Sequence, residues 1–518
     1  MDDNKEIKNE TDKHLVNTAK QSSIVFIGKF LGLFLGFAIS FVLARFFGPT
    51  VVGQYSLVKS VVNIVVIFSL FGFDNGLVKY ISKYSSDGQT KKIYFILRVA
   101  FIYAIIFSVV GALTVFLLKQ VIAKNIFNDD LLIKSLFYGA WIIIPFTLIK
   151  LFGGVYRGFQ KLKYFIIGPH IVRKLGFLVL LIFMYLLGIK ETSIVILALL
   201  LVQSMVVIYL IIQLSNLNLN LKDIIFSKIE NNKTFREEKK EFLAFSSTLI
   251  LISFMGVILS RVDRIMIGIY KSSTMVGIYN IAARIGTLAS FLLTSSNAIF
   301  SATISELYQS DKIKTLENIY STITKWLIIL TAPIILSMIF YSDIILSFFG
   351  QEYIKASNVL VLLALGQMIS VSVGANGFIL SMTGHEKLFL FDNFIMAITN
   401  IVLNIVLISR YGILGAALAT CISVAVFNII KVFQVKRLLN IIPYRKNYFH
   451  IIINFFTMIV TIVSINKLLP YDNIIIVIII TIINLILSVS ISYKFKDGFD
   501  EIVFNKLSIK INRLFKNQ

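Results

Sequence analysis

Long apolar runs alternate with short polar segments along almost the whole chain. Most runs hold about 20 residues, and an α-helix of that length crosses the ~30 Å hydrocarbon core of a bilayer. Hydrophobic residues make up 57% of the sequence, which is well above their share in an ordinary globular protein. The pattern therefore predicts an all-α, polytopic membrane protein.

Fourteen transmembrane helices are predicted, at residues 22–46, 54–77, 93–118, 131–152, 164–188, 192–213, 243–269, 277–300, 322–342, 356–381, 388–409, 413–434, 448–469 and 473–493. The first 21 residues mix acids and bases without an apolar core, so they are expected to form a tail rather than a signal peptide. The single cysteine, Cys421, lies in an apolar run. We therefore expect neither intrachain disulfides nor a metal site built from clustered cysteines.

Lysine and arginine are concentrated in the two terminal segments and in every second loop between the predicted helices. In multi-pass proteins, loops with such a basic excess face the cytoplasm. We therefore expect both termini in the cytoplasm and the protein in the plasma (inner) cell membrane. The same bias accounts for most of the net charge of +23, so nucleic acid is not expected as a partner.

The chain repeats itself at an offset of 224 residues. Residues 22–55 align without a gap on residues 246–279. The residues of the first copy that are identical in the second are Ser22, Ser23, Phe30, Gly32, Thr50, Val52, Gly53 and Tyr55. A second match, GFQKLKYF from Gly158 against GHEKLFLF from Gly384, has an offset of 226. The repeat contains six predicted helices. Because six is even, both halves cross the membrane in the same direction, related by an axis along the membrane normal.

The repeat predicts the domain organisation. We expect a cytoplasmic tail at 1–21, six-helix bundles at 22–213 and 243–434, a cytoplasmic linker at 214–242, two additional helices at 448–493 and a cytoplasmic tail at 494–518. Two similar bundles are suited to alternating access, with the substrate site in the cleft between the halves.

Four segments carry a resemblance to a known family: LARFFGPTVVGQYSLVKS, SRVDRIMIG, VGIYNIAAR and LNIVLISRYGILGAALAT. They resemble Wzx-type polysaccharide-synthesis flippases of the multidrug/oligosaccharidyl-lipid/polysaccharide exporter superfamily. The resemblance implies a V-shaped bundle with a lumen. It also implies movement of polyprenyl-diphosphate-linked oligosaccharide from the inner to the outer leaflet, for cell-surface polysaccharide synthesis. Its implied partners are the lipid-linked glycan, membrane lipid and polysaccharide assembly enzymes.

The ionisable residues inside the predicted helices are mostly basic, and Arg and Lys pair well with phosphate oxygens. The candidate lumen residues for a diphosphate are Lys29, Lys59, Arg173, Lys174, Arg261, Arg264 and Arg284. In the alternative reading such residues extend to the membrane interface, as we expect for Lys150 and Lys325 near helix ends. A helix break at Pro169 would likewise bring Arg173 and Lys174 to the inner surface.

Three polar residues are candidates for cation coupling. Asp263 stands between Arg261 and Arg264, while Asn400 and Asn404 share one helix face. Some members of the family resembled here use an intramembrane acid for coupling, so the coupling ion would be Na+ or H+. The alternative is hydrogen bonding between helices. No other cofactor is expected.

Two other functions compete with the flippase. A membrane enzyme acting on lipid-linked substrates would need a positioned acid, base or nucleophile, and no such constellation is present. We therefore expect that the protein is not an enzyme. A multidrug or cation antiporter of the same fold is the alternative, although a site for cationic drugs would need the opposite charge.

Overall fold

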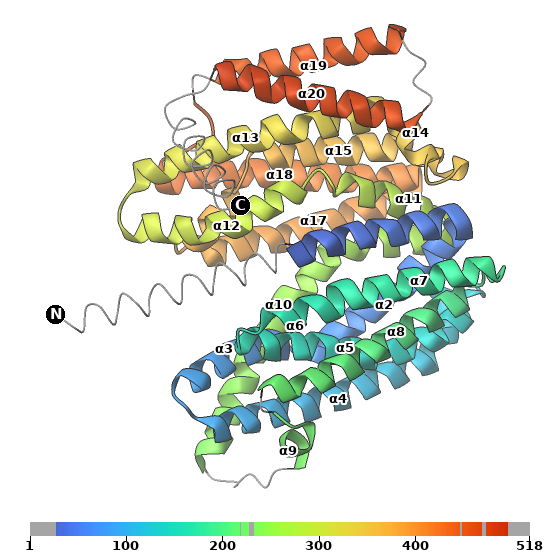
Figure 1. The fold of residues 1–518 in the computed structure, drawn as a ribbon, viewed down its shortest axis with the longest axis vertical. Coiled ribbons are helices and arrows are strands. Elements are labelled where there is room, and N and C mark those ends of the chain that lie inside the picture. The colour runs from blue at the N-terminus through green and yellow to red at the C-terminus, as the bar shows by residue number, and fades with distance from the viewer. Residues whose placement is uncertain (1–26, 218, 227–232, 446–447, 469–472, 496–518) are drawn as a thin grey trace, which may run out of the picture. The chain divides into compact units, whose positions relative to one another are not determined.

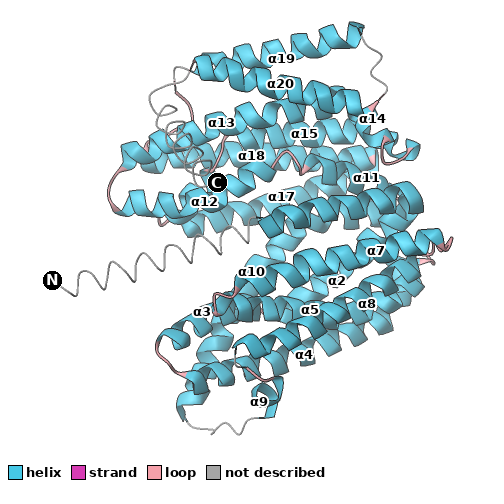
Figure 2. Ribbon diagram, in the orientation of Figure 1, coloured by secondary structure: helices cyan, strands magenta, loops and turns pink. Residues whose placement is uncertain are grey.

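The computed structural model describes residues 27–217, 219–226, 233–445, 448–468 and 473–495 (Figure 1). Within these residues every regular element is a helix, joined by short loops and turns (Figure 2). Residues 1–26 and 496–518, which hold the two predicted tails, lie outside the described residues. Contacts divide the chain into two compact units, Met1–Gly277 and Ile278–Gln518.

The first unit follows the span Ile27–Phe47 with a regular series of helices. These are η1 (Leu43–Phe47), α2 (Pro49–Leu70), α3 (Phe73–Ser86), α4 (Thr90–Gln120), η2 (Val121–Ile126), α5 (Leu132–Gly158), α6 (Leu162–Ile166), η3 (Ile167–Val172), α7 (Arg173–Leu186), α8 (Thr192–Gln213), η4 (Leu214–Leu217), α9 (Leu221–Phe226) and α10 (Lys233–Tyr270). The next helix, α11 (Ser273–Gly286), crosses the division between the units.

The second unit is also a succession of helices. These are α12 (Phe291–Gln309), α13 (Ile313–Phe340), α14 (Ser342–Ser347), η5 (Gln351–Ala356), α15 (Ser357–Ser372), α16 (Asn376–Met382), α17 (Glu386–Tyr411), α18 (Ile413–Leu439), α19 (Phe449–Leu468) and α20 (Ile474–Lys494).

Thirteen described helices are long and apolar enough to cross a membrane, and α11 with α12 forms one further span bent by 55°. The predicted all-α polytopic fold of about fourteen helices is therefore confirmed. A second irregularity was not predicted: the span Pro49–Ser86 turns at Phe71 and Gly72, whose φ angles are 51° and 75°. This turn separates α2 from α3.

Helix α5 is at the centre of the first unit, where it packs against α2, α3, α4 and α8. Large aromatic side chains fill these contacts, and Phe73, Phe101, Phe152 and Tyr156 are all nearly or fully buried. Helix α10, which the repeat assigns to the second bundle, contacts α2, α3 and α4. The domain boundaries taken from the repeat stay a prediction.

In the second unit, α13 packs against α15 and α20, and α18 packs against α15 and α17. The two helices after the repeat, α19 and α20, pair with each other (Figure 1). Met458 and Ile462 from α19 join Val477 and Ile480 from α20 in a buried cluster that includes Leu336 of α13. This apolar contact attaches the additional pair to α13.

A polar network connects α2 with the start of α11 inside the first unit. The Asp129 carboxylate accepts hydrogen bonds from Gln54 Nε2 at 2.9 Å and from Ser273 Oγ at 2.5 Å. Thr192 Oγ1 donates to Gln54 Oε1 at 2.6 Å, and the backbone N–H of Leu131 donates to Asp129 Oδ1 at 3.1 Å. Hydrogen bonds to a charged acceptor are among the stronger ones, so Asp129 links several helix ends.

Candidate substrate-binding site

Basic side chains and aromatic rings follow one another through the interior of the first unit. At one end, Lys59 Nζ of α2 lies 5.5 Å from the centroid of the Tyr55 ring. The Tyr55 ring stacks on Phe177 of α7, with centroids 5.9 Å apart and planes inclined by 16°. A cation over an aromatic face is attracted by the ring quadrupole, so Tyr55 fixes the position of the Lys59 ammonium group.

Arg173 continues this arrangement. Its Cζ lies 5.9 Å from the centroid of the Phe146 ring of α5. Lys150 Nζ, one helical turn further along α5, lies 5.2 Å from the same ring. The two cations repel each other, while Lys150 is attracted to Asp74 of α3.

Asp74 and Arg157 form the other end. Arg157 Nη2 lies 3.7 Å from Asp74 Oδ2 and donates a hydrogen bond of 3.3 Å to the Asp74 carbonyl oxygen. Gly154 allows this approach, because a Cβ there would overlap the Asp74 carbonyl and lie 2.9 Å from its Cα. The turn at Phe71 and Gly72 places Asp74 in the first turn of α3.

We call Lys59, Arg173, Lys150 and Arg157 the basic column. Within the described ranges, the Asp74 carboxylate pairs with Arg157 and attracts Lys150, while the column contributes four cations. Along α5 it extends over the twelve residues from Phe146 to Arg157, a rise of about 16 Å. Holding a cation at membrane depth costs about 2.5–3.5 kcal/mol even on lenient scales. An anionic ligand would offset that cost, and a diphosphate could contact several of these cations at once.

The helix does not break at Pro169, which was one of the two alternatives. Residues Ile167–Val172 form the π-helical segment η3, and the helical span continues from Leu162 to Leu186. Proline has no N–H to donate, and the wider π turn accommodates that loss within the helix. Arg173 follows this segment directly. Lys174 donates a hydrogen bond of 2.5 Å to the carbonyl oxygen of Gly32 in the first span.

The remaining predicted residues of the first unit lie elsewhere. Lys29 is exposed on the first span. In α10, Arg261 and Arg264 are partly buried, and Arg264 Nη1 donates a hydrogen bond of 2.6 Å to the carbonyl oxygen of Ser260 on its own helix. Asp263 is only 7% exposed. An acid so well buried in a long apolar helix remains a reasonable candidate for cation coupling.

The second unit contains the other predicted positions. Arg284 of α11 is partly buried. Asn404 Nδ2 donates to the carbonyl oxygen of Asn400 at 2.8 Å and to its Oδ1 at 3.0 Å. Both asparagines are buried on α17. Their amides therefore bond to each other along one helix face, as their i, i+4 spacing predicts.

The structure also reveals buried polar residues that sequence reasoning missed. Lys431 of α18 donates a hydrogen bond of 2.9 Å to Asn393 Oδ1, and Gln434 Nε2 donates one of 3.0 Å to Asp392 Oδ1. Lys325, which was expected to extend to the membrane interface, is 1% exposed and lies 5.8 Å from the Tyr448 ring, so protein groups enclose it. Lys150 lies among protein groups in the basic column. No stretch of sequence signals these contacts, because their partners come from other helices.

The thirteen described spans and the bent pair α11–α12 define a multi-pass membrane protein, and the basic column gives it a candidate site for an anionic ligand. A family model described as polysaccharide biosynthesis protein matches residues 18–305, more than half of the chain, and a MatE model matches residues 248–406. The chain belongs to the polysaccharide biosynthesis protein family. The predicted place in the multidrug/oligosaccharidyl-lipid/polysaccharide exporter superfamily is confirmed, and with it the expectation of a transporter rather than an enzyme.

Relatives and solved structures agree with this assignment. The membrane protein MJ1068 of Methanocaldococcus jannaschii is 25% identical over 413 residues, which cover 75% of this chain and 78% of that protein. The probable low-salt glycan biosynthesis flippase Agl15 of Haloferax volcanii is 27% identical over 186 residues, or 35% of this chain and 39% of that protein. The lipid II flippase MurJ in an inward closed conformation matches with a TM-score of 0.72 at 17% identity, covering 92% of this chain and 99% of that one. This last likeness shows the fold.

Proposed function

We propose that the protein moves a polyprenyl-diphosphate-linked oligosaccharide from the inner to the outer leaflet of the cell membrane. The observation that carries the proposal is the basic column, which contains four cations, two of which, Arg157 and Lys150, interact with the Asp74 carboxylate. The family assignment and the name of the Agl15 relative support a glycan substrate. Polysaccharide assembly enzymes would supply and consume it.

In this mechanism the diphosphate binds to Lys59, Arg173 and Lys150. Tyr55 and Phe146 hold these cations in place through their ring faces, so the site is organised before the ligand arrives. Arg157 is already engaged by Asp74, which leaves the remaining excess charge for phosphate oxygens. The acyl chain would stay in the bilayer while the charged head group crosses. Alternating access would then release the head group on the other side.

Orientation and coupling are part of the same proposal. The basic loops support a cytoplasmic position for both termini, so in this proposal the substrate enters from the inner leaflet. We propose Na+ or H+ as the coupling ion, with Asp263, Asn400 and Asn404 as its candidate ligands. The burial of Asp263 and of both asparagines supports their candidacy. Arg261, Arg264, Arg284, Lys29 and Lys174 remain proposed contacts for the phosphates during transfer.

Depletion in the native host tests the proposal. Loss of the protein should cause polyprenyl-diphosphate oligosaccharide to accumulate in the inner leaflet, and native protein should relieve that accumulation. Lys59→Gln and Arg173→Gln should fail to relieve it at equal expression, whereas Lys314→Gln, an exposed lysine outside the column, should succeed. Unchanged lipid distribution on depletion, together with lost resistance to cationic drugs, would favour the antiporter instead.

A further inference from the structure

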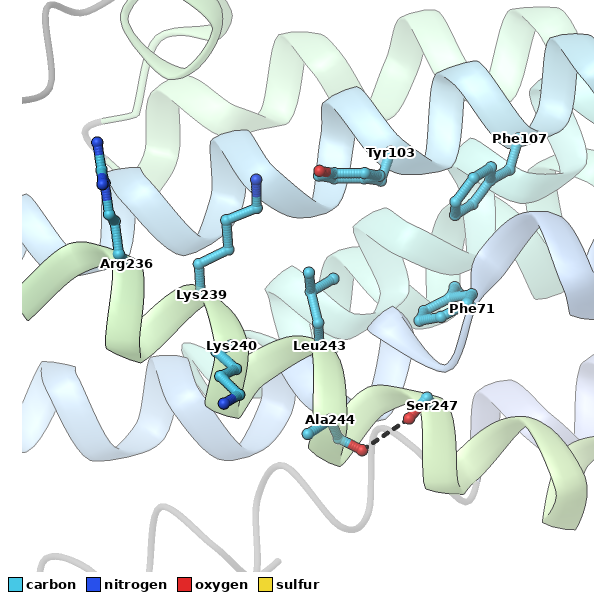
Figure 3. Close-up of a pocket in the computed structure, with 9 residues that line it drawn as sticks. All are labelled: Phe71, Tyr103, Phe107, Arg236, Lys239, Lys240, Leu243, Ala244 and Ser247. Atoms are coloured by element: carbon cyan, nitrogen blue, oxygen red, sulfur yellow. Dashed lines mark hydrogen bonds between the residues drawn. The ribbon is translucent and has the colours of Figure 1, made fainter. Parts of the chain in front are cut away.

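A pocket with a cavity volume of about 520 Å³ lies between α4 and the N-terminal half of α10, inside the first unit (Figure 3). It is separate from the basic column. Phe71, Tyr103 and Phe107 line one end of it, and Arg236, Lys239 and Lys240 line the other. A volume of this size is in the usual range for a small-molecule ligand site.

The basic residues near the start of α10 share one face of the helix. Arg236, Lys239, Lys240 and Leu243 follow the i, i+3, i+4, i+7 spacing of one helix face, and all four line the pocket. One neighbouring acid, Glu238, pairs with Lys92 of α4 at 2.5 Å. The pocket therefore has a positive end although the segment as a whole contains both charges.

The opposite end of the pocket is aromatic. The Phe107 ring lies 5.6 Å from the Phe71 ring and 5.8 Å from the Tyr103 ring, between centroids. Lys239 Nζ lies 5.1 Å from the Tyr103 centroid, so this contact orients the ammonium group at the boundary between the two ends. From Arg236 to Ser247 the pocket follows twelve residues of α10, or about 16 Å.

We propose that this pocket binds an anionic phospholipid of the bilayer. Its phosphate would lie among Arg236, Lys239 and Lys240, and its upper acyl chains would lie on Phe71 and Phe107. The charge gradient along the pocket matches a phospholipid, whose charged group and apolar chains are joined end to end. Basic pockets between transmembrane helices on the cytoplasmic side bind anionic head groups in this way. In the most apolar window of α10, only 12% of the residues are buried within the described structure.

The bound lipid would hold the first turns of α10 against α4. The assignment to the inner leaflet depends on the orientation proposed above. Binding itself does not depend on transport. A protein that binds phospholipid here but moves no glycan would refute the proposed function and leave this inference intact.

Native mass spectrometry of the purified full chain tests the inference, with phosphatidylglycerol as the probe and zwitterionic phosphatidylcholine, whose net charge is zero, as its counterpart. Arg236→Gln/Lys239→Gln should weaken phosphatidylglycerol binding at least about fivefold, the loss expected for one surface cation. Lys91→Gln/Lys314→Gln removes the same charge from exposed positions outside the pocket and should leave binding unchanged. Lys239→Arg, which keeps the charge, should retain binding and shows that the site tolerates substitution.

Four results would overturn the inference. Equal loss in the control pair would mean that overall charge draws the lipid. Equal binding of phosphatidylcholine would mean that the basic end of the pocket does not select a lipid by its net negative charge. Equal binding of soluble glycerol phosphate would remove the role of the aromatic end. Displacement of phosphatidylglycerol by equimolar polyprenyl diphosphate would make the pocket an entry site for the carrier lipid rather than a site for a bilayer lipid.

Discussion

Thr50 Oγ1 and Thr274 Oγ1 share a hydrogen bond of 2.9 Å, and the two residues are 224 positions apart in the sequence. That separation equals the offset of the internal repeat, so a residue contacts its own repeat equivalent. Gly53 and Gly277 show the same relationship. A Cβ on Gly53 would overlap the Ser273 carbonyl, and a Cβ on Gly277 would overlap the Pro49 carbonyl. Reciprocal contacts of this kind occur on a local twofold axis.

We expect Gly53→Ala and Gly277→Ala to destabilise this contact by about 1–3 kcal/mol each, because a methyl group would push apart two packed backbones. The melting temperature of the purified protein in lipid nanodiscs measures the effect. The double variant should lose less than the sum of the single losses, since either methyl group alone opens the same contact.

Gly256→Ala is the matched control for these variants. It lies in α10, and a Cβ there meets nothing within 4 Å. Alanine is also the better helix former, so the control should be neutral or slightly stabilising. Equal destabilisation by Gly256→Ala would contradict the role assigned to the contact.

A second prediction concerns the acid of the basic column. Asp74→Asn removes the carboxylate that pairs with Arg157 and attracts Lys150. Both partners in the ion pair keep some exposure, 21% for Asp74 and 32% for Arg157, so screening limits the loss to about 1 kcal/mol. A double-mutant cycle with Arg157→Gln, followed by thermal melting, measures the coupling. Strictly additive losses would show that the two side chains do not interact.

Membrane orientation can be tested with cysteine labelling. In a Cys421→Ser background, Lys314→Cys should be protected from a membrane-impermeant maleimide in intact cells, and Lys190→Cys should react. Both lysines are exposed in the structure, so their accessibility depends on the side of the membrane. Permeabilised cells should label both variants. Labelling of the Lys314 variant in intact cells would reverse the proposed topology.

Coupling to an ion gradient gives a further prediction. Asp263→Asn keeps the size of the side chain and removes its charge, so it should reduce gradient-driven transport at least about fivefold. Binding of polyprenyl diphosphate should change little, because the basic column is intact. Transport by proteoliposomes with imposed Na+ or pH gradients measures the effect. A variant that still responds fully to both gradients would remove Asp263 from the coupling mechanism.

The number and approximate positions of the helices could be predicted because each span is an apolar run of clear length. The breaks could not. The turn at Phe71 and Gly72 lies inside a continuous apolar run, and hydropathy carries no information about φ angles. The bend between α11 and α12 could not be predicted from the sequence for the same reason.

Only part of the candidate site could be predicted from the sequence. Lys59 and Arg173 could be chosen because a cation inside an apolar run is costly wherever it points. Lys150 was expected to reach the interface, since its distance from a helix end is visible in the sequence and its neighbours are not. Phe146 is one turn away on the same helix, but Asp74 comes from α3 and Arg173 from α7. Only the packing of three helices brings these groups together.

The most direct test of the central claim is outward movement of a fluorescent polyprenyl-diphosphate disaccharide in proteoliposomes that contain the purified protein. We predict that native protein and Lys314→Gln move the lipid across the bilayer, and that Arg173→Gln and Lys59→Gln move it at least about tenfold more slowly, the loss expected when a charge-assisted contact is removed. Movement no faster than in protein-free liposomes, or equal rates for native protein and Arg173→Gln, would contradict the account.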